Sequence, residues 1–207
     1  IQTSAILIGR QNEPGKEQKR EKYVVQIKKN VKQLVVILND FLSLSKLEEG
    51  KVIANKELFD FVALSKTLIE EVSMTKKTGK NIIFSSPKKP ISLNIDSKLV
   101  RHIFLNLLSN AIKYSPKNTN INIKIEESAF FVSLEVQDNG IGIPKEEQDK
   151  VFDRFFRAKN AQNIQGTGLG LNIVKQYAEL MDGTIAFTSE TNKGTTFLVK
   201  LPKPIKK

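Results

Sequence analysis

The feature that most restricts the fold is one long amphipathic stretch, residues 18–48, which Gly50 ends. Its apolar residues recur at intervals of seven in two series, Val24–Val31–Leu38 and Ile27–Leu34–Phe41. Four more apolar residues widen the stripe: Val35, Ile37, Leu42 and Leu44. Such a broad stripe is typical of a helix in a bundle rather than of a simple coiled coil. A helix of roughly 30 residues is about 45 Å long, so an antiparallel partner should be of similar length.

A second helical pattern, residues 1–10, precedes a turn around Pro14 and Gly15. We expect it to be the end of a longer helix whose first part lies outside the chain. The alternative is a short helix that is complete in itself. Residues 1–50 would thus be part of an antiparallel helical hairpin with a truncated first helix. The apolar stripe over residues 24–47 further predicts a homodimer, because a single chain cannot cover it.

After Gly50 the hydrophobic period changes, and residues 51–207 are predicted to form a second domain that begins with a linker. Residues 60–78, 96–115 and 170–182 have the period of helices. Strands are predicted at residues 81–85, 91–95, 121–125, 132–136, 185–189 and 195–201. Helices and strands interleave, but hairpins outnumber crossovers. The sequence therefore predicts an α/β fold, a two-layer sandwich of a mixed sheet covered by three helices.

The composition favours an anionic ligand and excludes some classes of site. The 207 residues include 33 Lys and Arg against 22 Asp and Glu, a formal net charge of +11. Such a chain attracts anions, although dispersed lysines are usually solvated surface. No basic stripe interleaved with aromatic residues predicts nucleic-acid binding. The sequence has no cysteine for a disulfide or thiolate metal site, and no apolar run approaches the ~18 residues of a membrane span.

Three alternating glycines, Gly166, Gly168 and Gly170, precede the last predicted helix in "QGTGLGLNIV". A dinucleotide-binding turn needs the spacing G-x-G-x-x-G directly after a buried strand, and a Walker A loop needs Lys-Ser or Lys-Thr after its last glycine. Neither pattern is present. A flexible loop that enters a helix start remains, where backbone amides can approach an anion. The alternative is a glycine-rich connector without a ligand.

An acidic residue, Asp138, continues the alternation of residues 132–136 on the apolar side of the strand. A buried carboxylate is costly unless it accepts hydrogen bonds, and the exocyclic amine of adenine is a suitable donor. Gly140 and Gly142 would leave room beside it for a flat ring. Thr195 also points inward by parity and could support that ring. The alternatives are an Asx-turn at Asp138 and an ordinary β-branched strand residue at Thr195.

One polar stripe crosses the otherwise apolar helix predicted at residues 96–115. It consists of Asn106, Asn110, Lys113 and Tyr114. Buried amides need partners, and the side-chain oxygen of Asn110 is a hard ligand that suits Mg²⁺. Lys113, one turn further on, can meet a phosphate. The alternative is a ladder of asparagines bonded to neighbouring backbone.

Five motifs in this order resemble the sensor histidine kinases of two-component systems. They are "NLLSNAIKYS", "DNGIGIP", "FDRFFR", "GTGLGLNIVK" and "GTTF", and the resemblance covers residues 52–201. The helix that ends in "LNDFLSLSKLEEGK" resembles the second helix of that family's dimerisation hairpin. The chain does not resemble the gyrase branch of the superfamily, which lacks the hairpin and the Phe-rich motif.

The resemblance implies a site for ATP and Mg²⁺ between the helices. Asp138 would read the adenine amino group and Asn110 would bind the metal. The implied ATP-binding residues are Asn106, Asn110, Lys113, Tyr114, Asp138, Gly140, Gly142, Arg157, Lys159, Gly166, Thr167, Gly168, Leu169, Gly170 and Thr195.

The resemblance also implies that residues 144–168 form a mobile lid. Phe152, Phe155 and Phe156 would anchor it, and Arg157 or Lys159 would reach the phosphates. The glycines that follow would serve both as a hinge and as a phosphate cradle.

In such kinases the γ-phosphoryl group passes to a histidine of the hairpin and then to an aspartate of a response regulator. The single histidine of this chain, His102, lies on the predicted nucleotide helix four residues before Asn106, so we expect a surface or core-edge residue. The fragment is therefore expected to bind ATP but not to phosphorylate itself. The alternative is a degenerate, dimeric scaffold without kinase activity.

The resemblance places this portion in the cytoplasm and leaves attachment of the protein to the inner membrane open.

Overall fold

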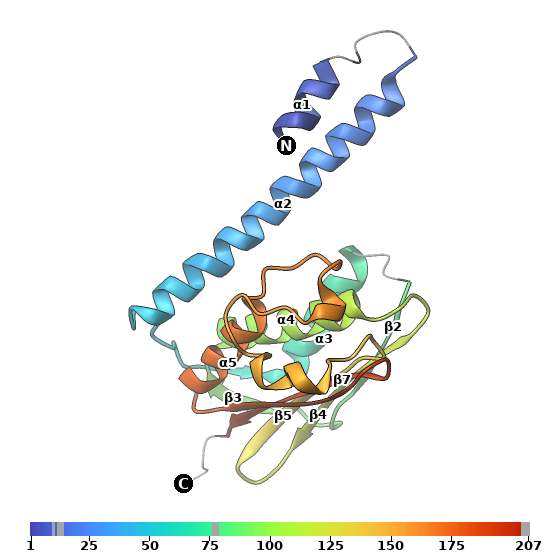
Figure 1. Cartoon of the computed structure of the whole chain (residues 1–207). Helices are drawn as coiled ribbons and strands as arrows, with labels where there is room; N and C mark the ends of the chain where they lie inside the picture. The colour runs from blue at the N-terminus through green and yellow to red at the C-terminus, as the bar shows by residue number, and fades with distance from the viewer. Residues whose placement is uncertain (10, 12–14, 76–78, 204–207) are drawn as a thin grey trace. The chain divides into compact units, whose positions relative to one another are not determined.

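The computed structural model describes residues 1–9, 11, 15–75 and 79–203, and the chain divides into two compact units, residues 1–49 and 50–207. The first unit consists of α1 (Gln2–Gly9), which packs against the much longer α2 (Glu17–Glu48) (Figure 1). The helix predicted at residues 18–48 is thus confirmed. Most of its apolar stripe faces solvent in the single chain, including Leu34, Leu38 and Phe41.

The second unit is built on a five-stranded mixed sheet with the order β2-β4-β5-β7-β6. Its strands are β2 (Asn81–Ser85), β4 (Asn120–Glu127), β5 (Phe131–Gln137), β6 (Thr184–Glu190) and β7 (Gly194–Pro202). The β2–β4 pair is parallel and the other three pairs are antiparallel. The alternation in β5 is real, because Val132, Leu134 and Val136 are all buried.

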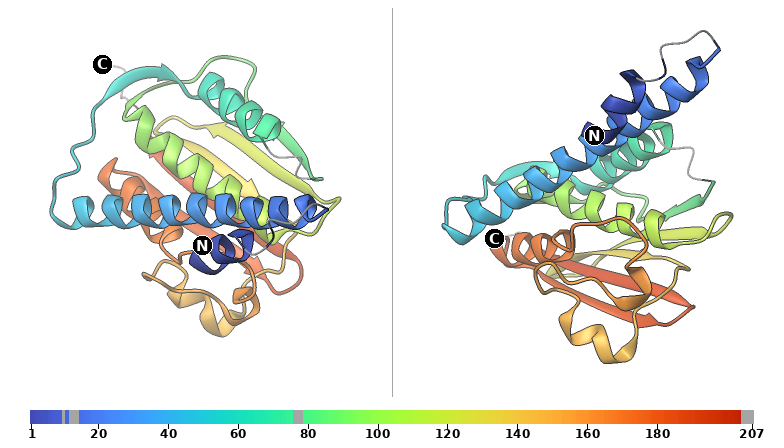
Figure 2. Two further views of the ribbon diagram at one scale, coloured as in Figure 1. Left: turned by 90° about the horizontal axis from the view of Figure 1, so that it is seen from above. Right: turned by 45° about the horizontal axis from the view of Figure 1, so that its top comes forward.

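Three helices lie on one side of this sheet, as predicted (Figures 1 and 2). They are α3 (Phe61–Thr75), α4 (Ser97–Tyr114) and α5 (Gly170–Leu180). The central helix, α4, contacts β5 and both other helices. It buries eight apolar residues, and fully burying one such side chain contributes about 1.5–3 kcal/mol. The core that forms beneath α4 therefore fixes where its polar stripe lies.

Two of the elements differ from the prediction. The segment predicted as a strand at residues 91–95 forms β3 (Ser92–Ile95), but it pairs with β1 (Glu57–Asp60) in a separate two-stranded sheet. The Asp60 side chain accepts from the backbone of Ile91 and Val62, which fastens β3 beside the start of α3. The helix predicted at residues 60–78 spans Phe61–Thr75, and residues 76–78 lie outside the described part.

The lid segment contains two short 3₁₀ helices, η1 (Lys145–Lys150) and η2 (Lys159–Ala161), between β5 and α5.

Asp96 joins the linker to the start of α4. Its Oδ1 accepts from the backbone N–H groups of Lys98 at 2.9 Å and Leu99 at 3.0 Å, which caps the helix. Its Oδ2 accepts from the backbone N–H of Asn55 at 2.8 Å. One buried carboxylate therefore both starts the central helix and holds the chain that leads into the domain.

We predict that Asp96→Ala lowers the free energy of unfolding by about 2 kcal/mol, because the helix cap is lost and buried N–H groups are left unpaired. Asp96→Asn retains one acceptor oxygen, so its free energy of unfolding should fall by less. Urea denaturation of both variants measures the effect. A loss below about 0.5 kcal/mol for the alanine variant would show that water replaces these bonds.

Candidate functional site

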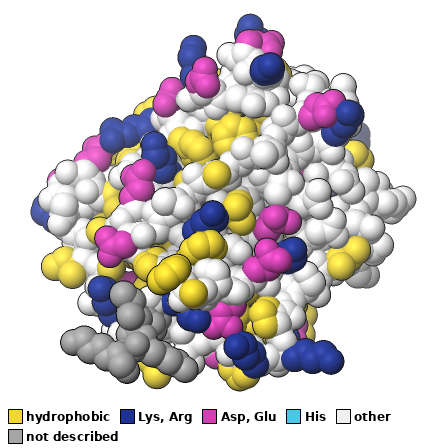
Figure 3. All heavy atoms as spheres, turned by 90° about the horizontal axis from the view of Figure 1, so that it is seen from below, with side chains coloured by type: hydrophobic (Ala, Val, Ile, Leu, Met, Phe, Trp, Pro, Cys, Tyr) yellow, Lys and Arg dark blue, Asp and Glu magenta, His cyan; other side chains and the backbone are white. Residues whose placement is uncertain are grey.

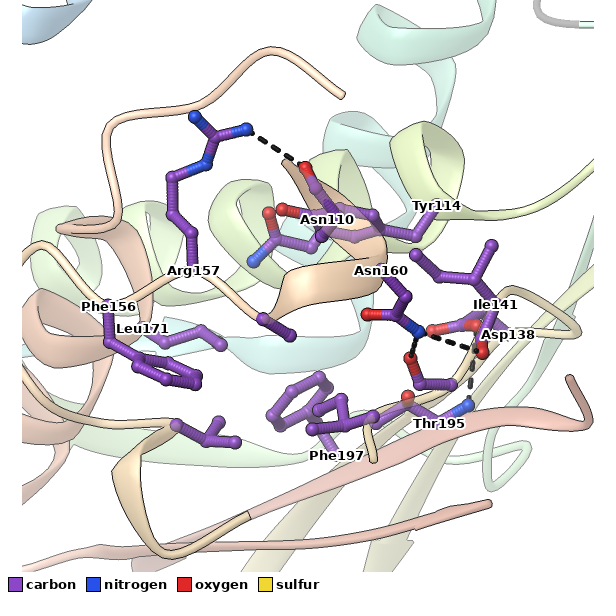
Figure 4. A pocket seen from close by; sticks show the side chains of 15 residues that line it. Asn110, Tyr114, Asp138, Ile141, Phe156, Arg157, Asn160, Leu171, Thr195 and Phe197 are labelled. Atoms are coloured by element: carbon purple, nitrogen blue, oxygen red, sulfur yellow. Dashed lines mark hydrogen bonds between the residues drawn. The ribbon is translucent and has the colours of Figure 1, made fainter. Parts of the chain in front are cut away.

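The predicted polar residues meet at a cavity between α4, the end of β5, β7 and the lid (Figure 4). It encloses about 590 Å³, counting the part that opens to solvent. Six of the predicted ligand residues line it: Asn110, Tyr114, Asp138, Gly142, Arg157 and Thr195. This arrangement brings the inward carboxylate and the polar stripe of α4 to the same cavity.

Asp138 lies one residue beyond β5 and is only 6% exposed, which confirms that its side chain points inward as the strand alternation predicts. Its backbone N–H donates to the carbonyl of Thr195 at 2.9 Å, which continues the β5–β7 pairing. Its Oδ1 accepts from the backbone of Gly140 at 2.8 Å and Thr195 at 3.3 Å. Within the described residues no hydrogen bond to Oδ2 is present, so that oxygen remains available to a donor in the cavity.

Burial raises the pKa of Asp138 to about 6. The hydrogen bonds from Gly140 and Thr195 and the positive charge of Lys80 act in the opposite direction but are weaker. The carboxyl group is therefore easier to protonate than that of a surface aspartate. A neutral hydrogen-bond donor such as an amine would be a favourable partner for it, whereas another anion would be repelled.

Thr195 is also buried, but its hydroxyl is engaged by a residue that the sequence did not reveal. Thr195 Oγ1 lies 2.9 Å from Ser189 Oγ, which in turn accepts from the backbone N–H of Ile143 at 2.9 Å. Ser189 thus joins β6, β7 and the loop that follows Asp138. Thr195 therefore supports the wall of the cavity together with Ser189.

Apolar side chains form the rest of the cavity wall. Phe197 rises from β7, Leu171 comes from α5, and Ile141, Phe156 and Ala158 come from the loop and the lid. A narrow apolar space with one carboxylate at its end suits a flat heterocycle that carries an amino group.

The stripe of α4 continues from this cavity toward the glycine loop. A Cβ on Gly170 would collide with Asn106 Oδ1, and a Cβ on Gly166 would collide with Lys113 Nζ. Lys113 also donates to the hydroxyl of Tyr114 at 2.8 Å. Both colliding atoms are ends of flexible side chains that could move aside, so these contacts do not require glycine. They show that the loop lies against the same polar stripe whose other members line the cavity.

The start of α5 offers free backbone donors beside this stripe. Its N-cap position is the buried Leu169, which provides no side-chain cap. The hydroxyl of Thr167 accepts from the backbone N–H of Leu169 at 3.1 Å and so shapes the loop rather than the helix start. An uncapped helix N-terminus next to a lysine favours an anion such as a phosphate.

The donor set at this corner fits Mg²⁺ held largely by phosphate and water. The described residues contain no group of three or more His, Cys, Asp or Glu side chains that could hold a metal alone. Asn110 is half-buried, lines the cavity, and makes no side-chain hydrogen bond within the described part of the chain. Its amide oxygen is therefore a suitable single protein ligand for a magnesium ion bound to phosphates.

The lid residues divide into those that line the cavity and those that do not. The guanidinium of Arg157 donates to the backbone carbonyls of Ala161, Gln162 and Ile164, so it shapes the lid in this conformation. Lys159 is exposed and does not line the cavity.

The three predicted aromatic anchors also differ. Phe156 lines the cavity, and Phe152 packs edge-on against Phe187 with ring centroids 5.7 Å apart. The prediction for Phe155 is wrong. Its φ of 61° turns the side chain outward, where it is 64% exposed, while its backbone lies against Gly168.

Gly140 and Gly142 do not have the predicted role of leaving room for a flat ring. A Cβ on Gly140 would lie 2.6 Å from Asp138 Oδ1 and 2.7 Å from the carbonyl oxygen of Tyr114. A Cβ on Gly142, where φ is 63°, would collide with the carbonyl of Glu190. These glycines permit close backbone packing around Asp138 rather than making room for a ring.

Asn160 is a further cavity residue that the sequence did not single out. It is one of several polar residues in the lid, and no periodicity or motif distinguishes it there. His102, in contrast, is exposed on α4 with its ring 5.9 Å from that of Tyr177, as expected for a surface or core-edge residue.

The charges do not gather into a basic surface on the face shown in Figure 3. Positive and negative side chains are interspersed on that face. On this face the described lysines and arginines are therefore dispersed rather than clustered.

The fold and the cavity define a nucleotide-binding domain of the two-layer α/β type with a lid. The profile of the family described as "Histidine kinase-, DNA gyrase B-, and HSP90-like ATPase" matches residues 95–205. The chain therefore belongs to that family, and its second unit is the catalytic domain of a sensor histidine kinase.

Individual relatives agree with this assignment. The sensor histidine kinase WalK of Bacillus subtilis is 32% identical over 185 residues, which are 87% of this chain and 30% of that protein. The mycobacterial sensor histidine kinase MprB has a TM-score of 0.64 at 28% identity, covering 71% of this chain and 98% of that one. Full-length ShkA in complex with AMPPNP has a TM-score of 0.76 at 22% identity, covering 89% of this chain and 39% of that one, and supports the fold. The chain thus spans less than a third of WalK.

None of the helices among the described residues is both long enough and apolar enough to span a bilayer.

The raised pKa of Asp138 predicts a pH-dependent stability of the nucleotide-free protein. A carboxyl group with a higher pKa in the folded state contributes stability below its unfolded value of 3.8, and this is lost as the pH rises through about 6. Asp138→Asn removes this titration. The original protein should lose on the order of 2–3 kcal/mol of unfolding free energy between pH 4 and pH 7 through this group, and the variant should not. The unfolding free energy of the variant minus that of the original protein should therefore be larger at pH 7 than at pH 4 by that amount. Urea titrations at both pH values measure the difference, and a difference independent of pH would contradict the prediction.

Proposed function

We propose that this chain is the ATP-binding core of a histidine kinase, which transfers the γ-phosphoryl group of ATP to a histidine outside the chain. The observation that carries the proposal is the buried carboxylate of Asp138, which shares one cavity with Asn110 and Tyr114 of α4. Asp138 Oδ2 would accept from the adenine amino group, while Ile141, Leu171 and other apolar residues cover the ring.

The phosphates would extend along the polar stripe from this cavity to the glycine loop. Lys113 and the N-terminus of α5 would bind them, and the oxygen of Asn110 would help to hold Mg²⁺, with Asn106 nearby. Bound Mg²⁺ would offset the phosphate charge. The ShkA complex with AMPPNP, an analogue of ATP, supports a triphosphate ligand for this fold.

The catalytic contribution of these residues is positioning and electrostatic stabilisation. Phosphoryl transfer needs an in-line nucleophile and little covalent chemistry from the domain that holds ATP. His102 is an unsuitable nucleophile, because it belongs to the packed helix α4 and its ring lies beside that of Tyr177, tilted by 57°. We therefore place the acceptor histidine on the first helix of the hairpin, outside this chain.

The proposal includes the partners that such a transfer requires. A response-regulator receiver domain would take the phosphoryl group, and two copies of the chain would pair through the helical unit, residues 1–49. The exposed apolar stripe of α2 supports pairing, since Leu34, Leu38 and Phe41 are about half exposed in the single chain. A cytoplasmic position of this portion is part of the same proposal, because ATP is available there.

The first prediction of this proposal concerns nucleotide binding. Asp138→Asn should weaken ATP–Mg²⁺ binding about 10–100-fold, because a charge-assisted hydrogen bond is lost and an amide N–H group faces the adenine amine. GTP should bind the original protein more weakly than ATP, because its ring carries a carbonyl oxygen in place of the amine. Isothermal titration calorimetry measures both effects.

Asp149→Asn is the matched control, because Asp149 is exposed on η1 and does not line the cavity. It should leave the affinity unchanged. If the original protein binds no ATP, the kinase proposal fails and the degenerate scaffold remains.

The second prediction concerns the helical unit. The chain should show a concentration-dependent dimer in sedimentation equilibrium, and Leu38→Glu should shift it toward the monomer by placing a charge in the apolar stripe. A change on the polar side of the helix, Lys29→Glu, is the control. A chain that is monomeric at all concentrations would argue against the dimerisation role.

A further inference from the structure

One of the side chains that join the lid to the rest of the domain, Asn160, does so at the cavity. Its Nδ2 donates to the backbone carbonyl of Gly142 at 2.9 Å and to that of Ile141 at 3.4 Å (Figure 4). Asn160 belongs to η2 in the lid, and the two carbonyls belong to the loop that follows Asp138. All three residues line the cavity. The contact therefore lies in the wall of the cavity.

The loop that receives these bonds is firmly held. The backbone N–H of Ile141 donates to the carbonyl of Tyr114, and the Ile141 carbonyl also accepts from the backbone of Asn192. The backbone of Ile143 donates to Ser189 Oγ. The loop is thus fixed to α4, to the β6–β7 turn and to β6, so it acts as a rigid anchor.

The segment that carries Asn160 is also preformed. Arg157 binds three carbonyls of the turn that follows it, and the backbone N–H of Lys159 donates to Glu147 Oε2 at 3.0 Å. These bonds lie within the lid. Gln148 of the lid also donates to this loop, through the carbonyl of Ile143 at 3.0 Å, and to the carbonyl of Ser189 at 3.1 Å. Of these two side chains, Asn160 is the one that lines the cavity.

The orientation of the amide follows from its partners. Only the NH₂ group can face two carbonyl oxygens, so the Oδ1 of Asn160 must point away from them. Figure 4 shows this oxygen on the side of the amide away from Ile141. The contact therefore depends on donor hydrogens and not merely on the volume of the side chain.

We propose that Asn160 is the latch of the lid: its two donated hydrogen bonds hold the lid over the cavity and slow the release of bound nucleotide. It is a positioning residue, since it acts through the loop beside Asp138 rather than on the phosphoryl group. The retention of nucleotide rests on the proposed ATP-binding function, whereas the attachment of the lid does not.

The test uses four variants of the 207-residue chain. Asn160→Ala removes the side chain, and Asn160→Asp keeps its shape but removes both donor hydrogens. Asn163→Ala and Asn163→Asp are matched controls for side-chain loss and added charge, because Asn163 is exposed in the same lid and does not line the cavity.

The first measurement is the dissociation rate of a fluorescent ATP analogue with Mg²⁺, followed by stopped flow after addition of excess ATP. Both Asn160 variants should release it about fivefold faster, as expected for the loss of one net hydrogen bond. Both Asn163 variants should stay within twofold of the original rate. If Asn160→Asp behaved like the original protein, shape alone would suffice and the latch would be refuted.

The second measurement needs no nucleotide and separates the latch from the proposed function. Hydrogen exchange of the lid peptide 157–165 should be at least threefold faster in the Asn160 variants than in the Asn163 variants. Equal exchange in all four variants would overturn the latch even if ATP binds. If the original protein binds no ATP, the proposed function fails, and hydrogen exchange still decides whether Asn160 holds the lid.

Discussion

The structure of the candidate site depends on keeping one carboxylate, that of Asp138, buried at the end of β5. Burial disfavours its ionised form, and two backbone N–H groups, those of Gly140 and Thr195, partly offset that cost. These donors are available because β5 pairs with β7 and because the next loop folds back tightly. Sheet register and loop geometry are thus both required to present the one remaining oxygen to a ligand.

The helix opposite this carboxylate joins the two ends of the site. Eight of the 18 residues of α4 are buried core, so its position is set by packing rather than by its polar residues. The packing of α4 thereby also fixes its polar stripe. Asn110 and Tyr114 lie at the cavity, and Asn106 and Lys113 lie against the glycine loop. Because Asp96 caps the same helix and binds the linker, the linker is hydrogen-bonded directly to the start of the element that carries these ligands.

The helices and strands could be predicted because the position of a residue in the helical or strand repeat decides whether its side chain faces the core or the solvent. The alternation of β5 placed Asp138 inside, and the apolar phase of α4 located its polar stripe. The separate β1–β3 sheet could not be predicted in this way, since the strand pattern of residues 91–95 does not identify a pairing partner. The outward position of Phe155 was likewise hidden, because its positive φ arises where the backbone packs against Gly168.

By itself, the sequence determined the order of helices and strands, the inward direction of Asp138 and Thr195, and the motifs that identify the kinase family, because these are local or periodic properties. Only the tertiary structure decided what each group contacts. It assigned Arg157 to the carbonyls of its own lid, joined Ser189 to Thr195, and placed Asn160 against the loop beside Asp138. The physical reason is that irregular segments have no period, so their hydrogen-bond partners follow from the surface against which the chain happens to fold.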